Sequence, residues 1–193
     1  MTGRPRSVSD DEIFEAVAQT VTESGPAGLT LAAVARRAGL TPPALTQRYG
    51  SKRGLLIAFA TREAGSVTTV FDEIRATGAG PLEALRDGLV AFTAPITTRE
   101  GMANNLAFLQ LDLTDEDLRE HSVKQSRALR AHLTELIRAA GLTGADPAEL
   151  ADTVYAIYAG AQLTWAIDGE GELGPWLARR IDRVLAPYRV LEM

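Results

Sequence analysis

The chain of 193 residues contains no cysteine. That absence excludes disulfides, zinc–thiolate centres and cysteine nucleophiles, and it suits a protein of the cytoplasm. No apolar run approaches the roughly 18 residues of a membrane span. The N-terminal sequence MTGRPRSVSDDE also lacks the hydrophobic stretch of a signal peptide. We therefore expect a soluble, cytoplasmic protein that does not enter a membrane.

Acidic residues are absent from position 24 to position 62, although the chain as a whole carries a net charge of −5. Residues 1–62 contain eight basic and five acidic residues, a net charge of +3, whereas residues 63–193 contain twelve and twenty, a net charge of −8. Such an asymmetry indicates that one end meets a polyanion, with chance as the alternative explanation. The window holds six basic residues: Arg36, Arg37, Arg48, Lys52, Arg53 and Arg62.

Helix signals follow one another along the whole chain, and no segment shows the alternation of a strand. Ser9 and Glu12 form a capping box, and Thr30, Thr41 and Ser51 are suited to cap the next three helices. The fourth helix is predicted to run to about Arg75. Further helices are expected near 82–95, 100–112, 116–140, 147–167 and 173–189, which makes an all-α fold of about nine helices.

The segment from Thr41 to Tyr49 has the properties of a recognition helix in a helix-turn-helix. Such a helix places small or polar residues of its first turns against base edges in the major groove. Leu45 and Tyr49, four residues apart, are predicted to hold it to the preceding helix. Gln is suited to adenine and Arg to guanine, which makes Gln47 and Arg48 candidate readers.

At these residues the chain resembles the TetR family of transcriptional regulators. The resemblance covers residues 9–62 in order and spacing, and it implies an all-α homodimer that binds DNA through an N-terminal three-helix domain. We assign residues 1–52 to this helix-turn-helix domain with its basic arm, and residues 53–193 to a helical domain for ligand binding and dimerisation. The fourth helix, 52–75, links the two. The carrying pattern is Leu29-Thr30, Val34-Ala35, Ala38-Gly39-Leu40-Thr41, Leu45, Tyr49-Gly50-Ser51-Lys52 and Leu55-Leu56.

The resemblance implies a set of DNA contacts, residue by residue. Lys52 matches the phosphate-binding lysine of the family, and Thr46 stands where the family usually has a tyrosine that contacts the backbone. That departure, and the two prolines at the start of the recognition helix, are unusual for the family. The alternative for Arg37 is a solvated charge, which we favour, and for Arg4 and Arg6 a free terminus. The predicted DNA-binding residues are Arg4, Arg6, Thr30, Arg36, Thr41, Pro42, Pro43, Ala44, Thr46, Gln47, Arg48 and Lys52.

The C-terminal half is less informative. Asn105, Phe108, Leu109 and Asp112 share one face of a predicted helix, and the resemblance implies a ligand pocket beside it. A core helix with a polar edge is the alternative. The candidate ligand-binding residues are Phe92, Met102, Asn105, Phe108, Leu109, Asp112, Tyr155, Tyr158, Gln162 and Trp165.

Two apolar stripes on the last two helices indicate an interface. In the family, two such helices from each subunit make a four-helix dimer contact, and simple core packing is the alternative for part of each stripe. The candidate dimer residues are Val154, Ala161, Leu177, Ile181, Val184, Leu185 and Tyr188.

No sequence pattern indicates an enzyme, a cofactor or a metal. His121 and His132 are too far apart along one helix to share a metal, and Asp115-Glu116-Asp117 is better explained as a helix start, with Thr114 as its cap. The predicted function is a ligand-responsive regulator, a repressor that binds a palindromic operator as a homodimer and is released by an unidentified small molecule. The alternative is an all-α small-molecule-binding protein or enzyme with a vestigial helix-turn-helix.

Overall fold

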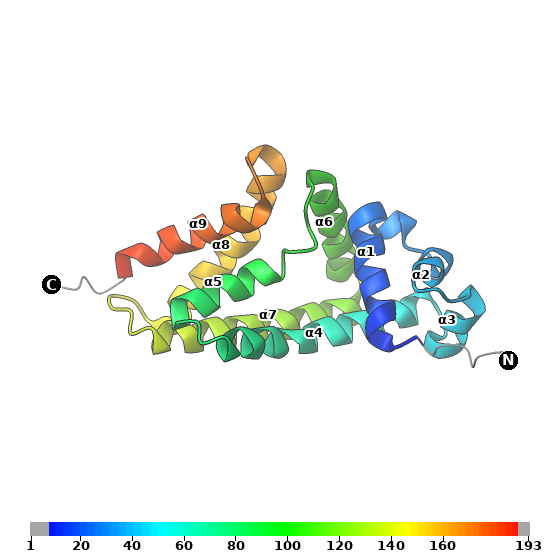
Figure 1. Ribbon diagram of the computed structural model, residues 1–193, viewed down its shortest axis with the longest axis horizontal. Coiled ribbons are helices and arrows are strands. Elements are labelled where there is room, and N and C mark those ends of the chain that lie inside the picture. Colours follow the sequence, from blue (N-terminus) through cyan, green and yellow to red (C-terminus); the bar gives the residue numbers. More distant parts are fainter. Residues whose placement is uncertain (1–7, 189–193) are drawn as a thin grey trace.

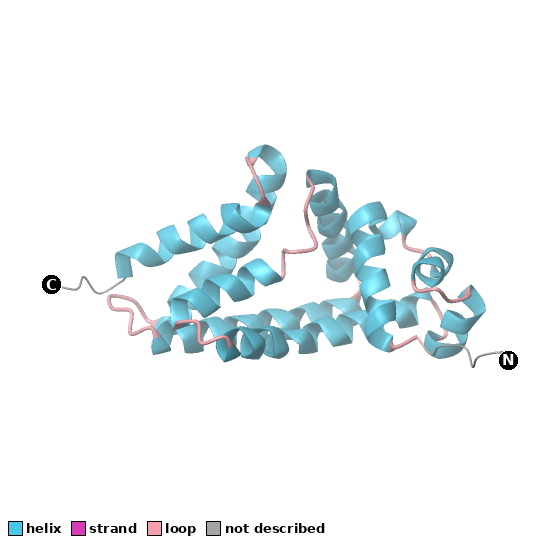
Figure 2. Ribbon diagram, viewed as in Figure 1, coloured by secondary structure: helices cyan, strands magenta, loops and turns pink. Residues whose placement is uncertain are grey.

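The computed structural model describes residues 8–188. Within that range every regular element is helical, as the sequence predicts, with nine α-helices and one short 3-10 helix joined by loops (Figures 1 and 2). The helices are α1 (Asp10–Gly28), α2 (Leu31–Arg37), α3 (Pro42–Tyr49), α4 (Lys52–Ala76), α5 (Pro81–Ala91), α6 (Arg99–Thr114), α7 (Glu116–Ala139), α8 (Pro147–Asp168) and α9 (Leu173–Leu185), followed by the 3-10 turn Ala186–Tyr188.

The predicted caps form hydrogen bonds at the helix starts. Ser9 and Glu12 make a complete capping box, in which the Glu12 carboxylate accepts from the Ser9 backbone N–H at 2.8 Å. Thr30 and Ser51 accept from the backbone N–H groups three residues on, at 3.1 and 3.0 Å. These bonds satisfy donors that the first turn of a helix leaves free. Local side-chain chemistry therefore sets these helix starts.

Two helix ends and one helix cap differ from the prediction. α5 ends at Ala91 rather than near 95, and α9 ends at Leu185 before the 3-10 turn. Asp115, not Thr114, caps α7, because its carboxylate accepts from the N–H groups of Asp117 and Leu118. Thr114 closes α6 instead, and its hydroxyl donates to the Gln110 carbonyl at 3.0 Å.

The small end of the molecule contains α1, α2 and α3 (Figure 1). Its core includes Ile13, Val17 and Leu45, and it also takes in Leu55 and Phe59 from the first turns of α4. Gly39, in the turn after α2, has a φ of +69°, a conformation that glycine adopts without strain. The N-terminal part of α4 is thus part of the small core.

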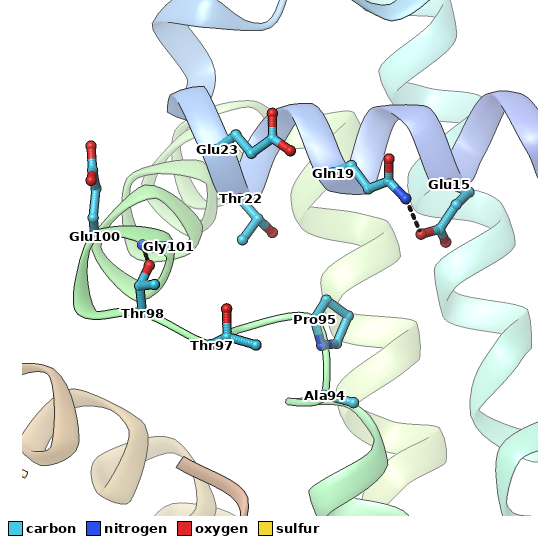
Figure 3. Close-up of a pocket in the computed structure, with 10 residues that line it drawn as sticks. All are labelled: Glu15, Gln19, Thr22, Glu23, Ala94, Pro95, Thr97, Thr98, Glu100 and Gly101. Carbon is cyan, nitrogen blue, oxygen red and sulfur yellow. Dashed lines mark hydrogen bonds between the residues drawn. The ribbon is translucent and has the colours of Figure 1, made fainter. Parts of the chain in front are cut away.

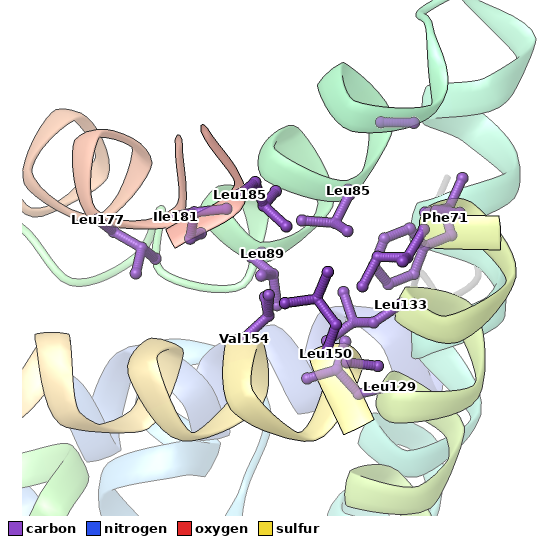
Figure 4. Packing of buried hydrophobic residues seen from close by; sticks show 14 of the residues in the cluster. Phe71, Leu85, Leu89, Leu129, Leu133, Leu150, Val154, Leu177, Ile181 and Leu185 are labelled. Atoms are coloured by element: carbon purple, nitrogen blue, oxygen red, sulfur yellow. The ribbon is translucent and has the colours of Figure 1, made fainter. Parts of the chain in front are cut away.

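The larger end is organised on α4 and α7, which lie side by side, with α5, α8 and α9 packed beyond them (Figure 1). Gly88 lets α5 approach α4 closely, since a Cβ atom there would lie 2.2 Å from the Phe71 ring. This core contains the fully buried side chains Phe71, Leu85, Leu89, Leu133, Val154, Leu177, Ile181 and Leu185 (Figure 4). α4 spans both cores and connects the two ends covalently.

Candidate DNA-binding surface and effector cavity

The helix-turn-helix is formed by α2 and α3. Leu45 is the single fully buried side chain of α3, and it packs with Val34 and Ala35 of α2. Tyr49 is partly buried, and its ring centroid lies 5.9 Å from that of Phe14 on α1. The predicted inward anchors Leu45 and Tyr49 therefore hold α3 against the two preceding helices.

The opposite side of α3 faces solvent. Pro42, Pro43, Thr46 and Gln47 are exposed, and Ala44 is half-buried. The Thr46 hydroxyl donates to the Pro42 carbonyl at 3.1 Å, whereas Gln47 forms no hydrogen bond to the described residues. An unpaired amide on an exposed helix face can accept and donate to a base edge.

The Arg48 side chain, unlike that of Gln47, is engaged in contacts within the protein. Its guanidinium donates to the Val8 carbonyl at 2.8 Å and forms an ion pair with Asp10, also at 2.8 Å. The Tyr49 hydroxyl donates to the same Asp10 carboxylate. Burial and this carboxylate both raise the Tyr49 pKa, so the phenol stays neutral. Sequence reasoning did not find this contact, because Asp10 lies about forty positions away and no local pattern signals it.

The remaining predicted DNA contacts are distributed around α3. Thr30 and Thr41 are exposed helix caps, and Arg36 is exposed without an ion pair to the described residues. Lys52 starts α4, and its ammonium donates to the Pro26 carbonyl at 3.2 Å. Arg4 and Arg6 lie outside the described residues.

Arg37 is engaged within the protein. It pairs with Glu23 and donates to the Gln19 side chain at 3.2 Å. Arg37 is therefore paired with α1 rather than being the solvated charge that the sequence favoured.

Three of the predicted ligand-binding residues meet at one cavity of about 170 Å³. Phe92 follows α5, and Tyr155 and Tyr158 lie on α8. The wall is completed by residues from α4 and α7: Glu63, Val67, Gln125, Ser126 and Leu129. The cavity is therefore formed by elements that are far apart in the sequence and that pack around α7.

The cavity combines aromatic rings with one carboxylate. The Tyr155 and Tyr158 rings are 6.4 Å apart, and burial raises the Tyr158 pKa, which keeps its phenol neutral. Glu63 carries the acidic charge, and its Oε1 accepts a hydrogen bond from Arg62 at 2.8 Å. Sequence reasoning missed Glu63, although its place on the linking helix was a signal that could have been used.

The α6 residues expected at the pocket do not line this cavity. Met102 is buried in a small cluster with Trp165 and Leu173. The Asn105 amide donates to the Thr22 hydroxyl of α1 at 3.2 Å and to the Gly101 carbonyl at 2.8 Å. The Asn105 side chain is thus engaged in packing, because α6 lies against α1.

The other three predicted α6 residues also lie outside this cavity. Phe108 packs edge-on against Phe59, with ring centroids 6.3 Å apart, and Leu109 is 45% exposed. Asp112 is half-buried, and its Oδ2 accepts from the Ser122 hydroxyl at 3.2 Å. Burial raises the pKa of Asp112 to about 6.

Two predicted ligand residues on α8 are also engaged elsewhere. The Gln162 amide donates to the Tyr158 carbonyl at 3.2 Å, and the indole N–H of Trp165 donates to the Gly171 carbonyl at 3.0 Å. Neither lines the cavity of Phe92, Tyr155 and Tyr158.

A wider groove, of about 560 Å³, separates α1 from the segment that joins α5 to α6 (Figure 3). Three of its lining side chains are acidic: Glu15, Glu23 and Glu100. The Gln19 amide donates to Glu15 at 2.8 Å, and Glu23 pairs with Arg37. None of the predicted ligand-binding residues lies in this groove.

Most of the predicted dimer stripe is core in the single chain. Val154 on α8 and Leu177, Ile181 and Leu185 on α9 are fully buried where α8 and α9 pack on each other and on their neighbours, which removes them from any outer surface (Figure 4). Tyr188 is partly buried against the same core, and its carbonyl accepts from the Thr143 N–H at 3.1 Å. This part of the stripe packs within the chain.

A different face of α8 is apolar and exposed. Leu163 is 47% exposed and Ile167 is 68% exposed. Beside them lies a groove of about 390 Å³ between α8 and α9. Ala161 and Val184 from the predicted set line it, together with Ala156, Ile157, Gly160, Thr164, Arg180 and Arg183.

Two of the three acidic residues at the start of α7 form ion pairs with one arginine. Arg53 pairs with Asp115 at 3.1 Å and with Asp117 at 2.6 Å. Across residues 8–188, no group of three or more His, Asp or Glu side chains is arranged to hold a metal ion. Over the same range, no helix has the length and apolar character needed to cross a bilayer.

Comparison with known proteins assigns both ends of the chain. Residues 13–59 match the family described as bacterial regulatory proteins, tetR family. Residues 81–186, more than half of the chain, match the C-terminal domain of BetI-type transcriptional repressors. The HTH-type transcriptional regulator BetI of Paraburkholderia phytofirmans is 30% identical over 132 residues, which are 66% of this chain and 67% of that protein.

Solved structures share the fold. A TetR transcription regulator from Haloarcula marismortui has a TM-score of 0.72 at 19% identity, covering 93% of this chain and 97% of its own. A transcriptional regulator from Saccharomonospora viridis, solved in complex with choline, also has a TM-score of 0.72, at 17% identity and with 92% and 95% of the two chains covered. The chain belongs to the TetR family of bacterial transcriptional regulators, with a DNA-binding domain at its N-terminal end and a BetI-type ligand-binding domain at its C-terminal end.

Proposed function

We propose that this regulator is a repressor that binds a palindromic operator as a homodimer and is released by a small quaternary ammonium compound. The observation that carries the DNA-binding part is the exposed, unpaired Gln47 on a helix held from behind by Leu45. We assign residues 1–52 to DNA binding and 53–193 to effector binding and dimerisation, with the fourth helix, 52–75, as the link.

The homodimer is supported by the outer face of α8. Large exposed apolar side chains such as Leu163 and Ile167 lie beside an apolar groove, a combination typical of protein–protein contacts. A second copy related by a two-fold axis presents the same face to it. Two recognition helices related in this way read two half-sites of opposite direction, which makes the operator palindromic.

A quaternary ammonium effector is supported by the chemistry of the cavity. Aromatic faces attract such cations through their quadrupole, and a nearby carboxylate adds a direct charge attraction. Phe92, Tyr155 and Tyr158 supply the rings, and Glu63 supplies the carboxylate. The choline-bound structural neighbour from Saccharomonospora viridis supports choline as the first compound to test.

The DNA-binding part is tested by selecting bound sequences from a random DNA pool and measuring affinity at increasing salt. We expect a palindromic consensus and an affinity that falls steeply with salt, because phosphate contacts release counterions. Lys52→Ala weakens binding to all sequences, whereas Gln47→Ala changes the preferred sequence. Purified protein without salt-sensitive DNA affinity at low ionic strength would contradict the proposed operator binding.

The effector part is tested by titrating choline chloride, with sodium chloride as the ionic control, into the protein–operator complex. We expect choline to release the DNA, and Glu63→Gln to lower choline affinity about tenfold through loss of the carboxylate charge. Glu73→Gln, an exposed α4 residue outside the cavity, is the matched control. Equal choline affinity in the two variants places the effector elsewhere.

The dimer is tested by sedimentation of the Ile167→Asp variant. A buried, unpaired charge opposes association, so the variant sediments as a monomer at concentrations where the original chain is dimeric. Glu170→Gln, an exposed position just beyond the end of α8, serves as the control. If Ile167→Asp is still a dimer, the dimer interface does not lie on this face of α8.

A further inference from the structure

Arg62 lies between the effector cavity and the start of α1. On one side its guanidinium donates to Glu63, in the cavity wall, at 2.8 Å. On the other side it reaches the Asp11 carboxylate of α1 at 3.3 Å. One side chain of α4 thus contacts both the cavity carboxylate and the DNA-binding domain.

The first turn of α1 also holds the recognition helix. Asp10, next to Asp11, accepts from Arg48 and from the Tyr49 hydroxyl, both at the end of α3. The charged path therefore continues from the cavity through Glu63, Arg62 and the first turn of α1 to α3.

We propose that Arg62 couples effector binding to DNA binding by sharing the Glu63 carboxylate with the cationic effector. This inference rests on the proposed function, since it takes the cavity as the effector site. A cation bound at the aromatic rings competes with the Arg62 guanidinium for the same carboxylate. When Glu63 turns to the cation, Arg62 loses one of its two anchors, which loosens the position of the guanidinium that pairs with Asp11 at the start of α1.

The competition has two thermodynamic consequences. Binding of the effector and the Arg62–Glu63 contact oppose each other, so removal of Arg62 raises the affinity of the cavity for the cation. Because coupling between two sites is reciprocal, the same removal reduces the effect of the cation on DNA affinity. Asp11 belongs only to the second half of the path, so its loss reduces the coupling without changing affinity at the cavity.

The size of the effect follows from exposure. The side chains of Arg62, Glu63 and Asp11 are 44%, 32% and 79% exposed, so each ion pair is screened by water. Partly exposed pairs of this kind change an equilibrium by about threefold rather than by orders of magnitude. Arg62 is therefore one contributor to the coupling, and a ratio of affinities is the appropriate readout.

The experiment measures operator affinity by fluorescence anisotropy with and without saturating choline chloride, and choline affinity by calorimetry, for Arg62→Ala and Asp11→Asn. We expect both variants to lower the choline-induced change in DNA affinity about threefold. Arg62→Ala also binds choline about threefold more tightly, whereas Asp11→Asn binds it as the original chain does. Arg75→Ala is the matched control, because Arg75 is another α4 arginine whose acidic partners, Asp72 and Glu135, lie within the larger end.

Each outcome decides the inference. If choline changes the DNA affinity of Arg62→Ala and Asp11→Asn by the same factor as that of the original chain, the inference is overturned while the proposed function stands. If Arg75→Ala reduces this factor as much as Arg62→Ala does, the inference is also overturned, because any α4 charge then has the same effect. If choline neither binds the original chain nor changes its DNA affinity, the proposed effector is wrong and the coupling falls with it.

Discussion

Helices α3 and α6 both carry side chains that the sequence marks as functional, but the structure uses them differently. α3 buries only Leu45, and Gln47 remains exposed with an unpaired amide. On α6, Asn105 is bonded to Thr22 of α1, and Met102 is buried beside Trp165. A polar group serves recognition only if packing leaves it free, and spacing along a helix does not report that.

The largest expected effect tests whether α3 depends on its one buried residue. Leu45→Ala removes a fully buried side chain and leaves a cavity, so the free energy of unfolding falls by about 3 kcal/mol. Denaturant unfolding measures the change. Thr46→Ala, the exposed neighbour, is expected to change stability by less than about 0.5 kcal/mol. Similar losses in the two variants contradict the division of α3 into a buried and a free face.

The second prediction separates Gln47 from Arg48 on the same helix. Gln47→Ala removes the free amide, so discrimination between operator variants falls by about 1–2 kcal/mol. Arg48→Ala removes the contacts to Asp10 and Val8 that position α3, so DNA affinity falls equally for all operator variants and the base preference is unchanged. Anisotropy titrations over a panel of single-base operator variants distinguish these outcomes. A changed base preference in Arg48→Ala would instead support Arg48 as a residue that contacts bases.

Much of the small end was predictable because its signals are local. The caps at Ser9, Thr30 and Ser51 act over three residues, and the spacing of Leu45 and Tyr49 defines the inner face of α3. Asp10 and Arg48 meet across about forty positions, so no local pattern predicted their pairing. Several acidic side chains can lie near one basic residue in the fold, and composition alone does not show which of them forms the ion pair.

The cavity illustrates the same limit in the larger end. Phe92, Tyr155 and Tyr158 were expected to face α6 at the pocket that the resemblance implies, and they do meet, but at a cavity that α6 does not line. Glu63 joins them only because α4 runs beside α7, a tertiary contact that periodicity does not encode. Likewise, helical spacing showed an apolar stripe on α8 and α9 but not whether Val154 or Ile167 faces solvent.

The third prediction tests whether Asn105 on α6 serves packing rather than effector binding. Asn105→Ala removes hydrogen bonds to Thr22 and to the Gly101 carbonyl, and should lower the free energy of unfolding by about 1 kcal/mol. Choline affinity should not change, because Asn105 does not line the cavity. Gln110→Ala, at an exposed α6 position, is the control for stability and is expected to have little effect. A loss of choline affinity in Asn105→Ala would return α6 to the effector site.

The smallest effect concerns the half-buried carboxyl group of Asp112 on α6. Its buried Oδ1 accepts no hydrogen bond from the described residues, and burial raises its pKa from 3.8 to about 6. Between these two values the folded chain binds more protons than the unfolded chain, so ionisation of Asp112 lowers stability as the pH rises from about 4 to about 6. Asp112→Asn removes the charge and keeps the shape. The free energy of unfolding of Asp112→Asn should therefore equal that of the original chain below pH 4. Above pH 6 it should be higher by up to about 1 kcal/mol, a value reduced by the partial exposure of the carboxyl group.

Denaturant unfolding at a series of pH values measures the difference. If the stability of the two proteins changes with pH in the same way, the Asp112 carboxylate is as well hydrated as the exposed side chains of α3, and burial does not raise its pKa.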